Sequence, residues 1–298
     1  MKNVLFRGLC TALVTPFIGG QINYPMLEVL IRRQIKAGVK AIVLAGTTGE
    51  SPTLSDEEKL ELFHQGVKIA DGKCRIIAGT GSNDTGHAIA LTQAAEDLGA
   101  DGALVVTPYY NKTTPSGCIK HYQQIASAVS LPIIAYNVPS RTGVDIDCTV
   151  CRELAKIPNL AGIKEAGGNL SKILQIIAEN GSQLPVWSGN DDQTVPIMSI
   201  GGQGVISVAS NVAPLYMSAM VTAAADGDYE LAGLLQRKLQ PMCRLLFCQV
   251  NPIPVKAAMK AIGYDVGSCR MPLDALSPEQ LKKVNEYFGQ FREVLDGV

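Results

Sequence analysis

The chain has 298 residues, of which 47% are hydrophobic and 18% are charged, and its formal net charge is −1. This composition excludes a disordered chain, and the lack of basic runs argues against a nucleic-acid surface. No stretch approaches the ~20 apolar residues of a membrane span, and Arg7 and Pro16 interrupt the amino-terminal run where a signal peptide needs apolar and small residues, so we expect a cytoplasmic protein without a membrane partner.

Short apolar runs recur along the first two thirds of the chain. They cover residues 8–14, 41–45, 75–79, 102–107, 132–137, 161–165, 185–188 and 204–209. Segments with helical periodicity lie between them, at 24–37, 55–70, 86–98, 116–128 and 170–178. Ser55 followed by Glu58 is a capping box, which begins a helix. We expect helices to end at Gly38, Gly99 and Gly181.

Eight strands that alternate with helices are typical of an α/β (β/α)8 TIM barrel. An open, doubly wound sheet also alternates, but it usually has five or six strands and a glycine-rich first turn. Here no G-x-G-x-x-G follows the first run, and the clustered glycines at 201–204 precede a strand. The pattern therefore favours the barrel.

The pattern changes towards the carboxyl end. From about Asp226 the sequence indicates helices without strands, at 229–249, 253–262 and 278–295. We therefore predict two domains, a catalytic barrel at 1–225 and a C-terminal helical domain at 226–298.

Cysteine and histidine are spread along the chain. Only Cys148 and Cys151 have C-x-x-C spacing, which by itself indicates metal or redox chemistry only weakly. The histidines are far apart and form no H-x-x-x-H pair, so we expect no histidine-ligated metal. We interpret the cysteines as reduced thiols that pack as small hydrophobic side chains.

Lys164 stands in a run that otherwise has the composition of a buried strand. Burial disfavours the charged form of a lysine, and the neutral amine is the form that attacks carbonyl groups. One interpretation is that its ammonium reaches water or pairs with Glu165. Because successive side chains of a strand point to opposite faces, Glu165 is a poor partner. We therefore interpret Lys164 as a nucleophile.

Other polar residues stand where the strands end, and in a TIM barrel these ends form one rim that holds the active site. Tyr136 lies on the strand next to Lys164, so it can carry a proton to and from an amine, with Thr47 and Tyr110 supplying hydrogen bonds. The main chain of 46–49 suits a carboxylate anchor at a helix start, and Arg141 offers a fork for a second carboxylate. A tight turn, loop packing and a solvated arginine are the plainer interpretations, but convergence on one rim favours a site.

Several segments resemble the dihydrodipicolinate (4-hydroxy-tetrahydrodipicolinate) synthase family, within the pyruvate-dependent class I aldolases. They are 46–50, 109–111, 136–143 and 162–166, and the similarity runs from end to end, including 251–256. The resemblance implies a lyase of the diaminopimelate route to L-lysine that condenses pyruvate with L-aspartate 4-semialdehyde. It also implies a homotetramer, a dimer of dimers, without metal or organic cofactor.

The resemblance assigns the catalytic residues. Lys164 forms a Schiff base with pyruvate, and loss of a methyl proton gives an enamine that attacks the aldehyde. Tyr136, Thr47 and Tyr110 relay protons, and Tyr110 comes from a neighbouring subunit.

It also assigns the substrate-binding residues. Thr48, with Thr47, holds the carboxylate of pyruvate. Arg141 binds the carboxylate of the semialdehyde. Two further residues complete the set: Gly189, directly after the seventh strand, and Ile206, within the eighth strand.

Related enzymes are the main alternatives. N-acetylneuraminate lyase and 2-keto-3-deoxy sugar-acid aldolases share the lysine, the tyrosine and the pyruvate half-site. Arg141 within Ser-Arg-Thr-Gly and the pair Thr47 and Thr48 favour the lysine-biosynthetic enzyme. A barrel that binds a keto acid without turnover is a further alternative, and a metal-assisted aldolase is disfavoured by the scattered histidines.

Many family members are inhibited by L-lysine at a dimer-interface pocket, whose equivalents here are Ser51, Asn83, His87 and Tyr109. His87 stands where lysine-sensitive members carry a glutamate that receives the ammonium, and Asp56 and Lys59 stand where they carry histidines. Loss of a hydrogen bond to a charged group typically costs ~1.5–3 kcal/mol, roughly ten- to a hundredfold in affinity. We predict weak or absent inhibition by lysine.

Overall fold

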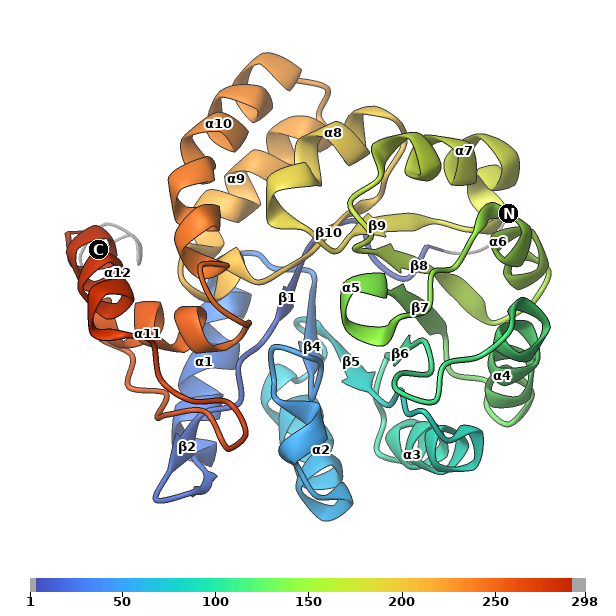
Figure 1. Ribbon diagram of the computed structural model, residues 1–298, viewed down its shortest axis with the longest axis horizontal. Helices are drawn as coiled ribbons and strands as arrows, with labels where there is room; N and C mark the ends of the chain where they lie inside the picture. Colours follow the sequence, from blue (N-terminus) through green and yellow to red (C-terminus); the bar gives the residue numbers. More distant parts are fainter. Residues whose placement is uncertain (1–3, 291–298) are drawn as a thin grey trace.

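The computed structural model describes residues 4–290, and a closed barrel of eight parallel strands lies at its centre (Figure 1). In chain order these strands are β1 (Gly8–Ala12), β4 (Ala41–Leu44), β5 (Arg75–Gly79), β6 (Gly102–Val106), β7 (Ile133–Asn137), β8 (Leu160–Glu165), β9 (Val186–Ser188) and β10 (Gly204–Ser207). β1 pairs with both β10 and β4, which closes the ring. The predicted TIM barrel is confirmed.

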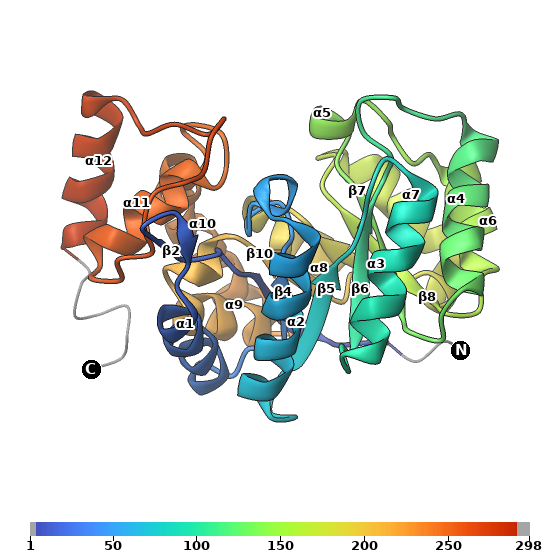
Figure 2. The same cartoon turned by 90° about the horizontal axis from the view of Figure 1, so that it is seen from below.

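Helices surround the strands, as Figures 1 and 2 show. They are α1 (Tyr24–Lys36), α2 (Asp56–Ala70), α3 (Thr85–Asp97), α4 (Pro115–Ser127), α6 (Cys148–Ala155), α7 (Leu170–Asn180), α8 (Thr194–Ser199) and α9 (Pro214–Ala225). The capping box predicted at Ser55 is present, since its side chain accepts from the amide of Glu58 and Glu58 bonds back. Gly38 and Gly99 follow α1 and α3 with φ of 77° and 83°, in the left-handed region that favours glycine.

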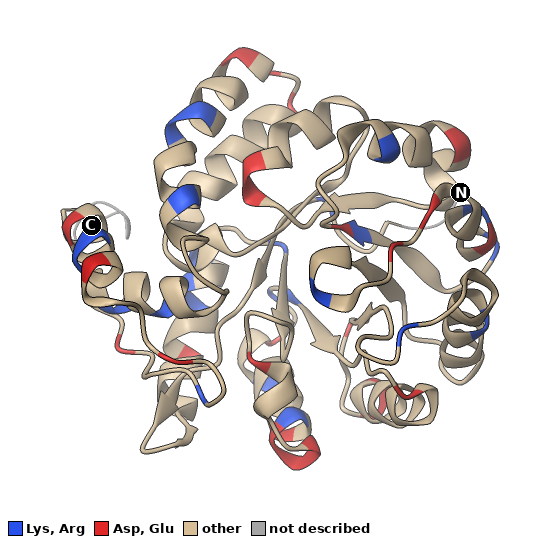
Figure 3. Ribbon diagram, in the orientation of Figure 1, with Lys and Arg blue, Asp and Glu red and all other residues tan. Residues whose placement is uncertain are grey.

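Two apolar layers hold this arrangement together. Inside the barrel, Phe6, Ile134, Trp187 and Ile206 belong to one buried cluster. A larger cluster lies between the strands and the helices. Figure 3 shows charged residues mainly on the surrounding helices and loops. Five of the free cysteines are buried, in keeping with their interpretation as small hydrophobic side chains: Cys10, Cys74, Cys118, Cys151 and Cys243.

The C-terminal segment is helical, with α10 (Tyr229–Leu246), α11 (Ile253–Ala261) and α12 (Pro278–Gly289). α10 packs against α9 and α8, and α11 packs against α12. The predicted helix at 278–295 is found from Pro278 to Gly289, and 291–295 lie outside the described residues. The domain division at 225 stays a prediction. No helix within 4–290 is long and apolar enough to cross a membrane.

Short elements escaped prediction. A hairpin of β2 (Phe17–Ile18) and β3 (Gln21–Ile22) follows β1. α5 (Pro139–Thr142) and the 3-10 turns η1 (Ser51–Thr53), η2 (Gly181–Gln183), η3 (Asp191–Gln193) and η4 (Ala209–Asn211) lie in the connections. These elements have two to four residues each, too few to show a helical or strand period, and none of them was predicted from an apolar run.

Candidate active site

Lys164 and Tyr136 lie side by side within the barrel. β7 and β8 pair in register so that Tyr136 stands opposite Lys164. The Lys164 ammonium nitrogen is 4.1 Å from the centroid of the Tyr136 ring, and the two residues are 5% and 7% exposed. Within residues 4–290 no carboxylate forms an ion pair with Lys164. The amine is therefore enclosed next to a phenol without an ion pair, although the buried carboxylate of Asp191 in η3 interacts with it electrostatically.

Glu165 points away from Lys164, as the alternation of the strand predicts. Its carboxylate accepts from Asn137 Nδ2 at 3.0 Å and from the amide of Gly167 at 2.6 Å, and it pairs with Lys172 of α7 at 3.2 Å. Burial raises the pKa of Glu165, although Lys172 acts in the opposite direction. Glu165 thus belongs to the contacts between the sheet and α7, outside the barrel.

Gly189 gives the Lys164 side chain its space. A Cβ atom at Gly189 would lie 3.1 Å from Cε of Lys164 and 2.7 Å from Cβ of Ala166. Contacts this short require a shift of the lysine or of the strand that bears Ala166. Ile206 is fully buried in the interior cluster that also contains Tyr136.

A cavity of about 260 Å³ opens at this rim. Its lining includes Thr47, Tyr109, Tyr136 and Arg141, which come from the loops or strand ends of β4, β6 and β7. Lys164 is not part of this lining. Its amine lies against the ring of Tyr136, which is part of the lining. Within 4–290, no group of three or more metal-ligating side chains occurs.

The loop after β4 has an unusual backbone. Ala45 and Glu50, at its two ends, have φ of 50° and 59°, which is costly for residues with a Cβ. The amides of Glu50 and Ser51 donate to the carbonyls of Thr47 and Gly46. The prediction that this loop begins a helix is wrong, because it leads into η1 and α2 starts only at Asp56. An anchor here would therefore use loop amides and hydroxyls without the dipole of α2.

Tyr110 is not brought to the cavity. Its side chain is 92% exposed and its φ is 69°, in the left-handed region. Across residues 4–290, no hydrogen bond joins the hydroxyls of Tyr136, Thr47 and Tyr110. Their proton relay stays a prediction that a single chain does not assemble.

The residues of the predicted lysine pocket are only partly together. Ser51, His87 and Tyr109 line the same cavity as Tyr136, whereas Asn83 lies outside that lining. His87 Nε2 is 2.8 Å from Asp56 Oδ2, and Lys59 Nζ is 3.2 Å from Asp56 Oδ1.

This arrangement bears on the ammonium of a lysine ligand. Partial burial acts to raise the pKa of Asp56, but hydrogen bonds from His87 and Lys59 hold it below its usual range. The carboxylate is thus already occupied by two partners. Weak lysine inhibition stays a prediction, and sub-millimolar lysine in a steady-state assay tests it.

Asn251 contacts two of the predicted substrate-binding residues, which sequence reasoning did not foresee. Its Nδ2 donates to Thr48 Oγ1 at 3.0 Å, and its carbonyl accepts from Arg141 Nη2 at 3.2 Å. In the sequence, Asn251 was noted only as part of the segment 251–256 that resembles the family, and that resemblance predicted no contact for it.

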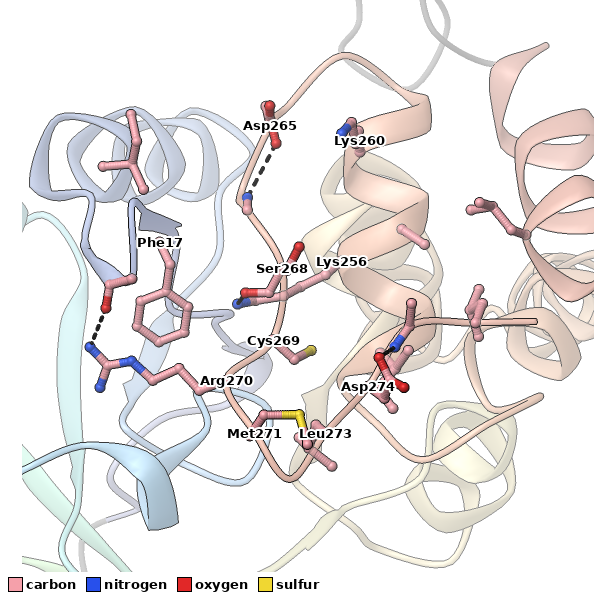
Figure 4. A pocket seen from close by; sticks show the side chains of 18 of the residues that line it. Phe17, Lys256, Lys260, Asp265, Ser268, Cys269, Arg270, Met271, Leu273 and Asp274 are labelled. Atoms are coloured by element: carbon pink, nitrogen blue, oxygen red, sulfur yellow. Dashed lines mark hydrogen bonds between the residues drawn. The ribbon is translucent and has the colours of Figure 1, made fainter. Parts of the chain in front are cut away.

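The C-terminal segment also contacts Glu50. Lys256 Nζ lies 2.5 Å from Glu50 Oε1, and both side chains are buried. Burial lowers the pKa of Lys256, although Glu50 acts in the opposite direction. Figure 4 shows Lys256 and Arg270 extending towards the Phe17 ring, whose centroid lies 4.2 Å from Lys256 Nζ and 4.5 Å from Arg270 Cζ. This cluster joins the loop after β4, the β2–β3 hairpin and α11.

Comparison with known proteins identifies close relatives. The profile of the dihydrodipicolinate synthetase family matches residues 5–290. The 4-hydroxy-tetrahydrodipicolinate synthase of Alkaliphilus oremlandii is 46% identical over 280 residues, which cover 94% of this chain and 97% of that protein. Dihydrodipicolinate synthase from Aquifex aeolicus is 41% identical with a TM-score of 0.94, over 97% of this chain and 99% of that one. The chloride-inhibited enzyme from Acinetobacter baumannii, solved in complex with pyruvate, is 42% identical with a TM-score of 0.92, over 95% and 99%.

Proposed function

The chain belongs to the dihydrodipicolinate synthetase family and has 4-hydroxy-tetrahydrodipicolinate synthase activity, that of a lyase of lysine biosynthesis, and we propose that it works through a Schiff base between Lys164 and pyruvate. The observation that carries this proposal is the enclosed position of Lys164, 4.1 Å from the Tyr136 ring and without an ion pair among residues 4–290. A lysine that no carboxylate holds in an ion pair is free to approach a bound carbonyl group, which its neutral amine attacks.

The proposed reaction begins at the ketone carbon of pyruvate. The amine of Lys164 adds there and water leaves, which gives an imine. Loss of a methyl proton turns the imine into an enamine, whose carbon attacks the aldehyde carbon of L-aspartate 4-semialdehyde. The amino group of that substrate then displaces Lys164 from the imine carbon, so the ring closes and the lysine is freed. In our proposal Tyr136 carries protons in these steps.

The substrate carboxylates require two receptors. Thr47 and Thr48 hold that of pyruvate in our proposal, and the amides of Thr47 and Thr48 support this role because they donate to no main-chain acceptor within 4–290. Arg141 lines the cavity and offers a planar fork to the semialdehyde carboxylate. Gly189 and Ile206 shape the space around Lys164 and the pyruvate carbons.

We propose a homotetramer built from two dimers, in which Tyr110 of the partner subunit completes the relay. An aromatic side chain that is 92% exposed on left-handed backbone supports this, because a second copy would bury it. The cytoplasmic location stays a prediction from the sequence.

Turnover of competing substrates tests the proposed function. Purified protein is assayed with pyruvate plus L-aspartate 4-semialdehyde, with N-acetylneuraminate, and with 2-keto-3-deoxygluconate. We expect turnover of the first pair only. Faster cleavage of either sugar acid would assign the protein to the aldolases, and pyruvate binding without any turnover would make it a keto-acid-binding barrel.

A further inference from the structure

The C-terminal segment reaches the loop after β4 at three points. Asn251 bonds to Thr48, Lys256 pairs with Glu50, and the amide of Arg270 donates to Glu50 Oε2 at 2.8 Å. The two contacts at Glu50 fix the end of the loop to the C-terminal segment. Only the contact of Asn251 reaches a side chain that is expected to touch substrate.

The hydrogen bond between Asn251 and Thr48 has a definite polarity. Asn251 Nδ2 is the donor and Thr48 Oγ1 is the acceptor, and the two residues are 6% and 2% exposed. A hydroxyl has one hydrogen to donate, and accepting a bond leaves that hydrogen free. Within the described part of the chain, the Thr48 hydroxyl donates to no protein acceptor. It is therefore kept as a donor for an incoming oxygen anion.

The main chain of Asn251 serves a different residue. Its carbonyl oxygen accepts from Arg141 Nη2 at 3.2 Å, which fixes one end of the guanidinium. One residue of the C-terminal segment thus contacts both expected carboxylate receptors, Thr48 through its side chain and Arg141 through its backbone. The amide oxygen of Asn251 is buried without a partner among residues 4–290, so its contact with Thr48 rests on the amide nitrogen alone.

We propose that Asn251 is a positioning residue for the reaction, which keeps the Thr48 hydroxyl oriented to donate to the carboxylate of pyruvate. This inference rests on the proposed role of Thr48. It extends the active site into the C-terminal helical segment, which otherwise contributes no residue to the proposed chemistry.

Asn251→Asp tests the polarity of this contact. A carboxylate only accepts hydrogen bonds, so the side chain introduced in this variant would take the Thr48 hydrogen away from substrate. We expect the KM for pyruvate to rise about tenfold or more, as for a lost hydrogen bond to a charged group. The KM for the semialdehyde should change much less, because the backbone carbonyl that Arg141 contacts is retained.

Asn251→Ala separates positioning from packing. It removes the donor but leaves the Thr48 hydroxyl free, so the KM for pyruvate should rise less than in Asn251→Asp. A residue that only fills space would give the opposite order, since Ala leaves a gap and Asp does not. Thermal unfolding of each variant checks the fold, and if Asn251→Asp does not fold, Asn251→Ala is carried into the cycle below.

A double-mutant cycle with Thr48→Val completes the test. If Asn251 acts through Thr48, Asn251→Asp adds little to the KM for pyruvate when Thr48→Val is present. An equal rise in both backgrounds would mean that the new charge acts directly, which overturns the inference. If Thr48→Val alone leaves this KM unchanged while Lys164 still reacts with pyruvate, the role of Thr48 is wrong and the inference falls with it, but the Schiff base stands.

Discussion

Tyr136 lies with its ring against the amine of Lys164, and at the scale of single residues our proposed mechanism rests on this contact. We predict that Tyr136→Phe lowers kcat by roughly 10²–10⁴-fold, the usual contribution of a general acid–base group, with a small change in the KM for pyruvate. Steady-state kinetics measure this.

Tyr122→Phe is a matched control. Tyr122 is also buried, but its hydroxyl donates to the carbonyl of Val105 behind the sheet. Its loss should lower thermal stability and leave kcat near the wild-type value. Equal losses of kcat in both variants would show that Tyr136 has only a structural role.

The positions of single residues could be predicted where a local sequence pattern determines them. Lys164 and Tyr136 follow from strand periodicity and strand order, which bring them into register. Asn251 and Thr48 are 203 residues apart, and no local pattern joins them. Such a contact depends on how the C-terminal segment packs on the barrel.

At the scale of elements, the burial of His121 between α4 and α3 makes the stability of the fold depend on pH. Its Nδ1 lies 2.9 Å from Thr85 Oγ1 of α3, and its Nε2 is buried without a partner among the described residues. Burial lowers the pKa of His121 to about 4, from an ordinary value near 6.5. The unfolded chain therefore takes up a proton at a higher pH than the folded protein does, and stability is lost as the pH falls from about 6.5 to about 4.

His121→Asn should weaken this pH dependence. We expect the difference in unfolding free energy between pH 6.5 and 4 to be smaller in the variant than in the wild type, by a few kcal/mol at most. Denaturant unfolding at several pH values measures it, with His64→Asn on exposed helix surface as the control. Parallel pH curves for wild type and His121→Asn would contradict the prediction.

A second prediction concerns the contribution to stability of the ion pair between Lys256 of α11 and Glu50 of the loop after β4. Lys256→Met leaves the buried carboxylate of Glu50 without its ion-pair partner, and breaking such a pair typically costs about 3–5 kcal/mol of unfolding free energy. The double variant with Glu50→Gln should recover much of the loss, because no buried charge remains.

Lys260→Met is the control, one turn along the same helix on its exposed side. It should change the unfolding free energy by less than about 0.5 kcal/mol. Equal unfolding midpoints for Lys256→Met and Lys260→Met would show that the pair with Glu50 contributes nothing.

The periodicity of apolar residues predicted long helices well and short elements poorly. α2 and α10 have several turns of periodic apolar residues, and their predicted starts lie within one residue of the observed ones. The β2–β3 hairpin has two residues in each strand, and it packs through Phe17 against Lys256 and Arg270. Tertiary contacts specify such an element, so the sequence pattern alone did not reveal it.

At the scale of the whole molecule, the exposed Tyr110 predicts active sites shared between subunits. Tyr110→Ala and Lys164→Ala should each be inactive alone. Co-expressed in equal amounts, they should regain up to about a quarter of wild-type activity, because half of the dimers are mixed and one site in each has every residue. Activity of the purified mixed protein measures this. If it stayed at the level of the single variants, Tyr110 would act within its own chain or not at all.

Covalent capture of pyruvate by Lys164 is the most direct test of this account. The protein is incubated with pyruvate and sodium borohydride, which reduces an imine to a stable secondary amine, and the digested peptides are mapped by mass. The Schiff-base mechanism predicts an adduct on the peptide that contains Lys164, with none on Lys164→Ala and none without pyruvate. An unmodified Lys164 in protein that turns over substrate, or an adduct on another lysine, would contradict it.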